Sequence, residues 1–139
     1  MDYTKELFRD LYWNYIEAPY ETAEAFKEAL RTYHKSIGYK GTYPKIKWDE
    51  NTINSPKVMI AAIVLPLEEY EEVREHIETL EAANGKYFTA LDLLYQTHNK
   101  IGSPILGDRD NHFFEGFAFA VEEKFGEEKI PVYVLITGS

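Results

Sequence analysis

The longest uninterrupted apolar run of the chain lies near its middle, at residues 58–65. It contains no polar side chain, is rich in β-branched residues and lies between Pro56 and Pro66. The run is too short to cross a bilayer as a helix. Its length and composition predict a strand that is buried on both faces, with the neighbouring amphipathic segments packed over it.

A second apolar run, residues 130–137, predicts another buried strand close to the end of the sequence. Helical patterns separate the two runs, so we expect a crossover and a parallel pair of strands. The spacing in residues 113–125 fits either a helix or a strand, and we favour the helix, ending at Gly126. If these residues form a strand instead, they make a hairpin with 130–137 and the sheet is mixed.

Four other segments space their apolar residues as one face of a helix does. They are residues 3–16, 19–38, 67–85 and 87–100. In the third, Leu67, Tyr70, Val73, Ile77 and Leu80 are predicted to face the core. Residues 45–48 alternate and predict a short strand, and Gly102-Ser103-Pro104 is predicted to break the last helix.

The predicted fold class is therefore α/β (or α+β). We expect a single small domain over residues 1–139, with about five helices on a short mixed sheet. Its central strand is 58–65 and its C-terminal strand is 131–137. In parallel sheets, ligand sites lie at the carboxyl ends of the strands. The loop 102–112 is predicted to reach that edge, and a strand at 45–48 would enter from it.

Composition narrows the classes of function. The 139 residues contain no cysteine, which excludes disulfides, thiol catalysis and thiolate metal sites. The sequence starts without a signal-peptide pattern and has no segment apolar enough to cross a membrane, so we expect a cytoplasmic protein. The net charge of −9 disfavours nonspecific binding to nucleic acid and favours a basic partner protein.

Seven glutamates in residues 68–81 are accompanied by only one cation, Arg74. A solvated helix usually intersperses lysines, because like charges three or four residues apart repel. The unpaired acids indicate a surface for a basic protein, although a simple solvated face is the alternative. The predicted interface residues are Glu68, Glu71, Glu72, Glu75 and Glu78.

The segment from Ala29 to Trp48 is the opposite, since it lacks acids and interleaves basic with aromatic residues. Such a composition suits a phosphate-bearing small ligand or nucleotide. Solvent-facing cations and a guarded strand edge explain the same residues without any ligand. The ligand-binding candidates here are Arg31, Lys35, Lys40, Tyr43, Lys45, Lys47 and Trp48.

The loop at residues 108–112 concentrates polar side chains beside Gly107. Asp108, Arg109, Asp110 and His112 are candidates for ligand binding. Asp108, Asp110 and His112, together with Glu115, are also candidates for a small metal-assisted enzyme. The alternative is that Asp110 or Asn111 caps a helix that begins at residue 112. The histidines at 34, 76 and 98 each fit a helix position, where we predict surface or boundary side chains.

No nucleotide-binding, zinc-protease or serine-hydrolase motif is present in the sequence. We therefore predict no resident metal or cofactor and no catalytic residue, and catalysis stays open but disfavoured. The preferred function is a non-catalytic acidic protein that engages or neutralises a basic partner, as immunity proteins, antitoxins and inhibitors do. The two alternatives are the phosphate-ligand module at 31–48 and the metal-assisted enzyme at 108–115.

Overall fold

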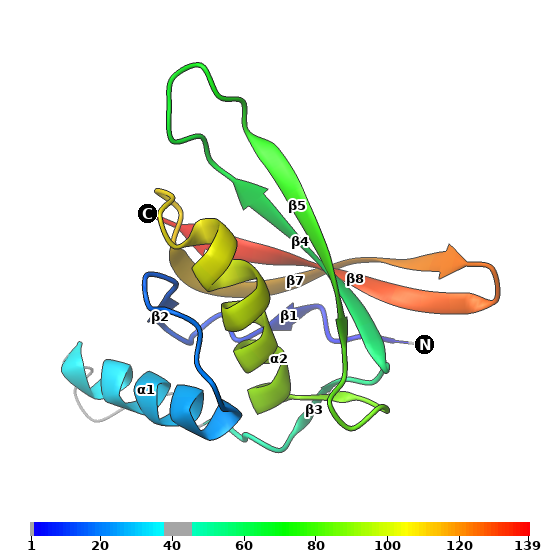
Figure 1. Ribbon diagram of the computed structural model, residues 1–139. Helices are drawn as coiled ribbons and strands as arrows, with labels where there is room; N and C mark the ends of the chain where they lie inside the picture. Colours follow the sequence, from blue (N-terminus) through cyan, green and yellow to red (C-terminus); the bar gives the residue numbers. More distant parts are fainter. Residues whose placement is uncertain (1, 38–45) are drawn as a thin grey trace.

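A computed structural model describes residues 2–37 and 46–139. Its centre is a mixed six-stranded sheet (Figure 1). The strand order is β1-β7-β8-β4-β5, where β1 is Glu6–Leu7, and the short strand β2 (Trp13–Asn14) also pairs with β7. Its long strands form two antiparallel hairpins (Figure 1). The first hairpin joins β4 (Lys57–Val64) to β5 (Arg74–Glu81), and the second joins β7 (Phe113–Phe125) to β8 (Glu128–Gly138). The chain is a small mixed α/β domain, as the sequence predicts.

The two apolar runs form β4 and β8, and they pair in parallel as predicted. Met59 is opposite Val132 and Ala62 is opposite Leu135. Burial on both faces is only partly correct for β4: Val58 and Ile60 are fully buried on one face, while on the other Ala61 is buried and Ile63 is 41% exposed. No helix in the described part of the chain packs on that second face.

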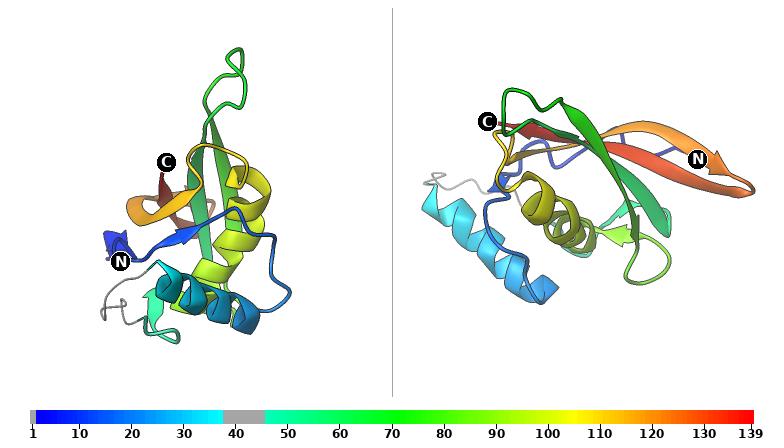
Figure 2. Two further views of the ribbon diagram at one scale, coloured as in Figure 1. Left: turned by 90° about the vertical axis from the view of Figure 1, so that its left-hand side faces the viewer. Right: turned by 45° about the horizontal axis from the view of Figure 1, so that its top comes forward.

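Both α-helices lie on the same side of the sheet (Figures 1 and 2). Helix α1 (Ala23–Ser36) begins after Thr22, whose hydroxyl accepts a hydrogen bond from the Ala25 amide at 3.1 Å. Helix α2 (Ala90–Thr97) begins in the same way after Thr89. Each cap satisfies an amide that the first turn leaves unpaired. These helices confirm the predicted helices at 19–38 and 87–100, with shorter bounds.

Only these two α-helices occur in residues 2–37 and 46–139, so the prediction of about five helices is wrong. The segment 3–16 contains the short strands β1 (Glu6–Leu7) and β2 (Trp13–Asn14), both antiparallel to β7. Leu11, Trp13 and Tyr15 are buried at every second position, which is the period of extended chain. Leu7, Leu11 and Tyr15 also match helical spacing, so local periodicity alone does not distinguish a helix from a strand. Pairing with β7 determined that the segment is extended.

The predicted helices at 67–85 and 113–125 are also wrong, because both segments form strands. Residues 74–81 are β5, and of the five side chains predicted to face the core only Leu80 is buried. Residues 113–125 are β7, and the alternative of a hairpin with 130–137 is the correct one. Each strand completes a backbone ladder along a neighbouring strand, which outweighs a weak local preference for helix.

The predicted break at Gly102-Ser103-Pro104 does not end the helical path. A π-helical segment, η1 (His98–Leu106), continues α2 through these residues. A Cβ on Gly102 would overlap the ring of Tyr15, so this glycine permits close packing of η1 on the N-terminal segment. Gly102 is thus a packing residue.

A small second sheet pairs β3 (Asn51–Ile53) with β6 (Phe88–Thr89). The strand predicted at 45–48 is not formed by its described residues, Ile46 to Trp48, while Lys45 lies outside the described residues. The Trp48 carbonyl accepts a hydrogen bond from the Leu91 amide, at the start of α2. This segment therefore does not enter the sheet at the carboxyl ends of β4 and β8.

Candidate protein-binding hairpin

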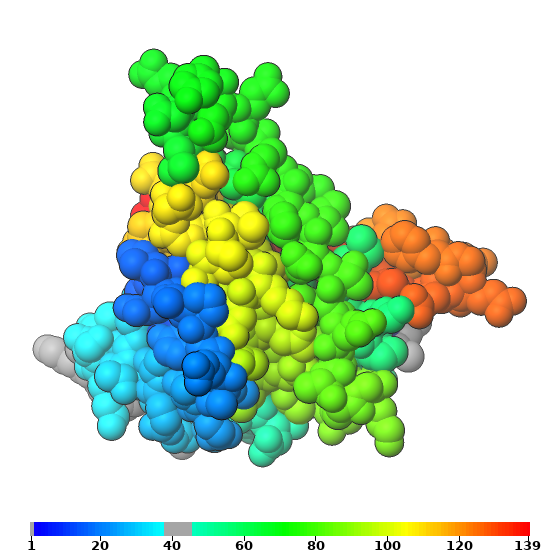
Figure 3. Space-filling view, in the orientation of Figure 1, coloured from blue at the N-terminus to red at the C-terminus, as the bar shows by residue number. Residues whose placement is uncertain are grey.

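The β4–β5 hairpin extends beyond the body of the domain (Figures 1 and 3). Its strands pair without a bulge from Lys57–Glu81 at the base to Val64–Arg74 at the far end. Residues 65–73 connect them and form the projecting tip. The tip leaves the sheet at the carboxyl end of β4, which is the edge where the strand order predicts a site.

Large apolar side chains are exposed on this hairpin. Tyr70, at the tip, is 84% exposed, and its hydroxyl has no hydrogen-bond partner among the described residues. An exposed aromatic side chain on a projecting element is typical of the residues that dominate protein–protein binding. The exposed apolar residues of the hairpin are Ile63, Leu67, Tyr70, Val73 and Ile77.

Acidic residues surround these apolar side chains. Residues 67–81 contain seven glutamates and one arginine, a net charge of −6 with neutral histidine, out of −9 for the whole chain. Apolar residues with a charged rim have the anatomy of a protein interface. This one projecting element therefore has a net charge equal to two thirds of the net charge of the whole chain.

The structure places all five predicted interface glutamates on this hairpin. Glu68, Glu71 and Glu72 lie in the connection, and Glu75 and Glu78 lie on β5. Glu71 is paired with Arg109 at 3.3 Å, and Glu78 lies 3.0 Å from His76 Nε2. These glutamates were selected because few cations accompany them in the sequence. That selection does not depend on whether the segment forms the expected helix or the observed hairpin.

The loop 107–112 supports the base of the tip. The Arg109 guanidinium donates to the Leu65 carbonyl at 3.0 Å, in addition to its contact with Glu71. The side-chain amide Nδ2 of Asn111 donates to the Ile63 carbonyl at 2.8 Å and to the Thr137 hydroxyl at 2.9 Å. The loop thus joins the ends of β4 and β8, and its predicted position at this edge is confirmed.

These contacts give the polar loop a structural role. Residues 113–125 are a strand, so the expectation that Asp110 or Asn111 caps a helix there is wrong. Asp108, Asp110 and Glu115 are exposed, and His112 Nδ1 lies 2.7 Å from the Arg109 carbonyl. Among the described residues, no three histidine, aspartate or glutamate side chains are grouped to hold a metal ion.

The basic segment is not brought together as one site by its described residues. Arg31 pairs with Glu28 at 2.9 Å on the exposed face of α1, where Lys35 also lies. Trp48 is half-buried, with Lys27 Nζ 5.6 Å from the centre of its ring. Lys40, Tyr43 and Lys45 lie outside the described residues.

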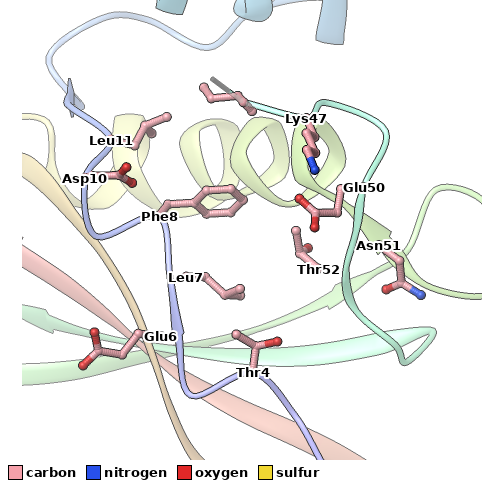
Figure 4. Close-up of a pocket in the computed structure, with 11 residues that line it drawn as sticks. Thr4, Glu6, Leu7, Phe8, Asp10, Leu11, Lys47, Glu50, Asn51 and Thr52 are labelled. Carbon is pink, nitrogen blue, oxygen red and sulfur yellow. The ribbon is translucent and has the colours of Figure 1, made fainter. Parts of the chain in front are cut away.

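Lys47 does contribute to a pocket of about 280 Å³ between the N-terminal segment and residues 46–52 (Figure 4). The Phe8 ring points into this pocket, and its backbone has φ of 57°, a conformation that is uncommon for a bulky residue. The lining also carries Glu6, Asp10 and Glu50. Three carboxylates against one ammonium favour a cationic ligand over a phosphate.

His98 is the principal titratable group inside the core. It is fully buried beneath Trp13, whose indole Nε1 donates to His98 Nδ1 at 3.0 Å, while His98 Nε2 lies 3.1 Å from the Ala18 carbonyl. This arrangement requires the neutral ring with its hydrogen on Nε2. Burial lowers the pKa of His98, although the Ala18 carbonyl opposes that change. His34 is buried too, so the predicted surface or boundary position is wrong for both.

Comparison with protein-family models, curated proteins and solved structures found no match. None of the helices in the described parts of the chain combines the length and apolarity needed to cross a membrane.

Sequence reasoning missed the exposed apolar residues of the hairpin, because it assigned Leu67, Tyr70, Val73 and Ile77 to the core. The available signal was the glutamates themselves. In a helix these acids would repel one another along the turns, whereas in a hairpin they alternate with the apolar side chains and separate. The absence of lysine among these glutamates was therefore also a signal against the predicted helix.

Proposed function

We propose that this protein is a non-catalytic binding protein whose β4–β5 hairpin engages a cationic partner protein. The observation that carries the proposal is the projecting tip, where exposed Tyr70 and Leu67 are accompanied by the exposed glutamates Glu68, Glu69 and Glu72. Apolar contact supplies affinity at the centre of such an interface, and opposite charge accelerates association. Occupying a basic functional surface of the partner would neutralise it, as inhibitors and immunity proteins do.

The affinity of this hairpin for a basic protein can be tested by capture from the lysate of the source cells at low salt. The variant Glu68→Lys/Glu69→Lys/Glu72→Lys reverses the charge of three exposed side chains of the tip that take no part in the core. We expect this variant to lose the captured cationic protein while keeping its melting temperature.

The matched control is Glu123→Lys/Glu127→Lys, which reverses two exposed glutamates at the tip of the β7–β8 hairpin. It removes acidic charge from the chain without touching the β4–β5 hairpin, and we expect it to retain the partner. Equal loss in both variants would show a response to net charge alone and would contradict a site on the hairpin. Capture of the same proteins by all three forms would also contradict it.

A second candidate function is suggested by the pocket at Phe8, whose backbone is strained and whose lining also includes three carboxylates and Lys47. Such strain is often found at ligand sites. The charges favour a small cationic amine over the phosphate-bearing ligand predicted for residues 31–48. Thermal-shift panels of polyamines and of nucleotides separate the two, since a ligand at a hundredfold over its Kd adds about 2.7 kcal/mol of stability.

A further inference from the structure

The outer edge of β5 has no partner strand among the described residues. β5 is the last strand in the order β1-β7-β8-β4-β5, whereas the opposite side of the sheet is closed by β1 and β2. An edge strand presents unpaired amide and carbonyl groups that can pair with another chain. Proteins that recognise extended peptides use such edges.

Two hydrogen bonds show which β5 residues direct their backbone groups outward. The Ala82 amide donates to the Pro56 carbonyl at 2.8 Å, inside the hairpin. The Glu81 carbonyl faces the other way and accepts from Gln96 Nε2 at 2.8 Å. In an antiparallel strand, every second residue directs its backbone N–H and C=O toward the partner strand, and the residues between direct theirs away from it. The β4–β5 register has no shift, so this alternation continues along the whole of β5. The residues with outward backbone groups are therefore Glu75, Ile77 and Thr79.

The side chains of these three residues lie on the open face of the sheet. Ile77 pairs with Ala61 and Glu75 pairs with Ile63, both on β4. Ile77 is 50% exposed and Ile63 is 41% exposed, so an apolar strip runs from the edge strand β5 onto β4 on the side away from α2. A new strand on this edge would extend the strip and shield Ile77 from water.

We propose that a strand of a cationic partner protein adds to the outer edge of β5. The inference rests on the proposed function and specifies how the partner binds. Charge selects the occupant: a second copy of this chain would set two net-negative edge strands side by side, and like charges across strands are destabilising. The acidic edge thus resists self-pairing, and a basic strand removes the repulsion.

The register of β5 specifies the sequence that such a strand prefers. In an antiparallel strand, a basic residue faces Glu78, a β-branched residue faces Ile77, and a second basic residue faces Glu75. The strand thus reads Lys/Arg, Val/Ile, a residue opposite His76, then Lys/Arg. Cross-strand pairs of this kind contribute roughly 0.2–1 kcal/mol each.

The experiment uses the full chain and a blocked heptapeptide, Thr-Lys-Val-Thr-Lys-Thr-Val, with amide hydrogen exchange followed by NMR. We expect the peptide to slow exchange of the Glu75, Ile77 and Thr79 amides by about tenfold or more, because these amides become hydrogen-bonded. Exchange should be unchanged at the Ala62 amide, which already lies inside the sheet. A peptide with N-methylated valine should give no protection.

The paired variants are Ile77→Pro and Ile77→Val. Proline removes the outward amide without removing a β4–β5 hydrogen bond, which an edge strand tolerates, and we expect it to abolish protection. Valine keeps the amide and should retain protection. Should Ile77→Pro fail to fold, the N-methylated peptide supplies the same test on the wild-type chain.

Protection that survives both N-methylation and Ile77→Pro would overturn strand addition, as would its complete absence with the parent peptide. The proposed function has a separate readout, namely capture of the partner and its loss on charge reversal at Glu68, Glu69 and Glu72, which lie outside β5. Loss of strand addition with that capture intact would leave the hairpin as a binding element that uses its side chains alone.

Discussion

The two long hairpins of this domain have the same topology but different surfaces. The β7–β8 hairpin turns tightly, with Phe125 opposite Glu128, whereas residues 65–73 make a long connection between β4 and β5. Residues 121–131 carry four glutamates and two lysines, a net −2, against −6 for residues 67–81. The two hairpins therefore differ both in the length of the connection and in net charge.

The difference lies in how the charges are balanced locally. In the β7–β8 hairpin, Lys124 is directly opposite Lys129 among the acids, Glu122 accepts a hydrogen bond from the Tyr3 hydroxyl at 3.0 Å, and Glu128 pairs with Lys57 at 3.2 Å. β7 is also paired on its outer side by β1 and β2. Among the described residues, the β4–β5 hairpin leaves its outer edge and most of its acids without partners, and the proposed binding role rests on this difference.

The largest effect that we expect comes from Asn111→Ala, which breaks the junction between the two hairpins. The variant loses the hydrogen bonds to Ile63 and Thr137 and leaves a carbonyl of β4 unpaired. Chemical denaturation should show a free energy of unfolding lowered by about 1–3 kcal/mol. The control, Asp108→Ala, changes an exposed neighbour and should stay within about 0.5 kcal/mol. Equal stability of the two variants would show that the junction is not needed.

A smaller effect is expected for Tyr70→Ala, which tests the tip of the binding hairpin. The side chain is 84% exposed, so its loss should leave the melting temperature unchanged. Affinity for the captured cationic protein should fall about tenfold or more if Tyr70 is a central contact. Phe125→Ala is the matched change on the β7–β8 hairpin, where 50% of the side chain is exposed. Calorimetry should show that Phe125→Ala binds the captured protein with wild-type affinity. A similar loss of affinity in Tyr70→Ala and Phe125→Ala would contradict the proposed difference between the two hairpins.

The smallest effect concerns the core that both hairpins share. Burial lowers the pKa of His98 below the ordinary 6.5, so the unfolded chain takes up this proton before the folded chain does. The contribution of neutral His98 is fully present above pH 6.5 and is lost as the pH falls through the pKa of the folded state, with a slope of at most about 1.4 kcal/mol per pH unit.

Denaturation of the wild type and of His98→Gln between pH 7 and pH 5 measures this contribution, because the carboxylates are common to both proteins. The variant should lose stability less steeply as the pH falls. Parallel curves would mean that His98 does not titrate differently in the folded and unfolded chains. Binding comparisons between the hairpins are best made above this range, where the core is unaffected.

Local sequence patterns identified the parts of the fold that their own composition determines. The apolar run at 58–65 has no polar side chain, and the run at 130–137 has only the hydroxyls of Tyr133 and Thr137, so both become adjacent central strands. Helix α1 has a threonine cap and buried residues four apart, Phe26, Leu30 and His34, which no competing pattern disturbs. The concentration of glutamate at 68–78 was also visible, since formal charge does not depend on conformation.

Only the tertiary structure decided the segments whose periodicity was ambiguous. Residues 113–125 fit a helix about as well as a strand, and the spacing of residues 67–81 predicted a helix. For both segments, a free strand beside them supplied a ladder of backbone hydrogen bonds that an isolated window does not reveal. That outcome moved Tyr70 and Ile77 from an expected core to the surface and created the open edge of β5. The sequence by itself determined where the charge lies, and long-range pairing determined which side chains and backbone groups accompany it.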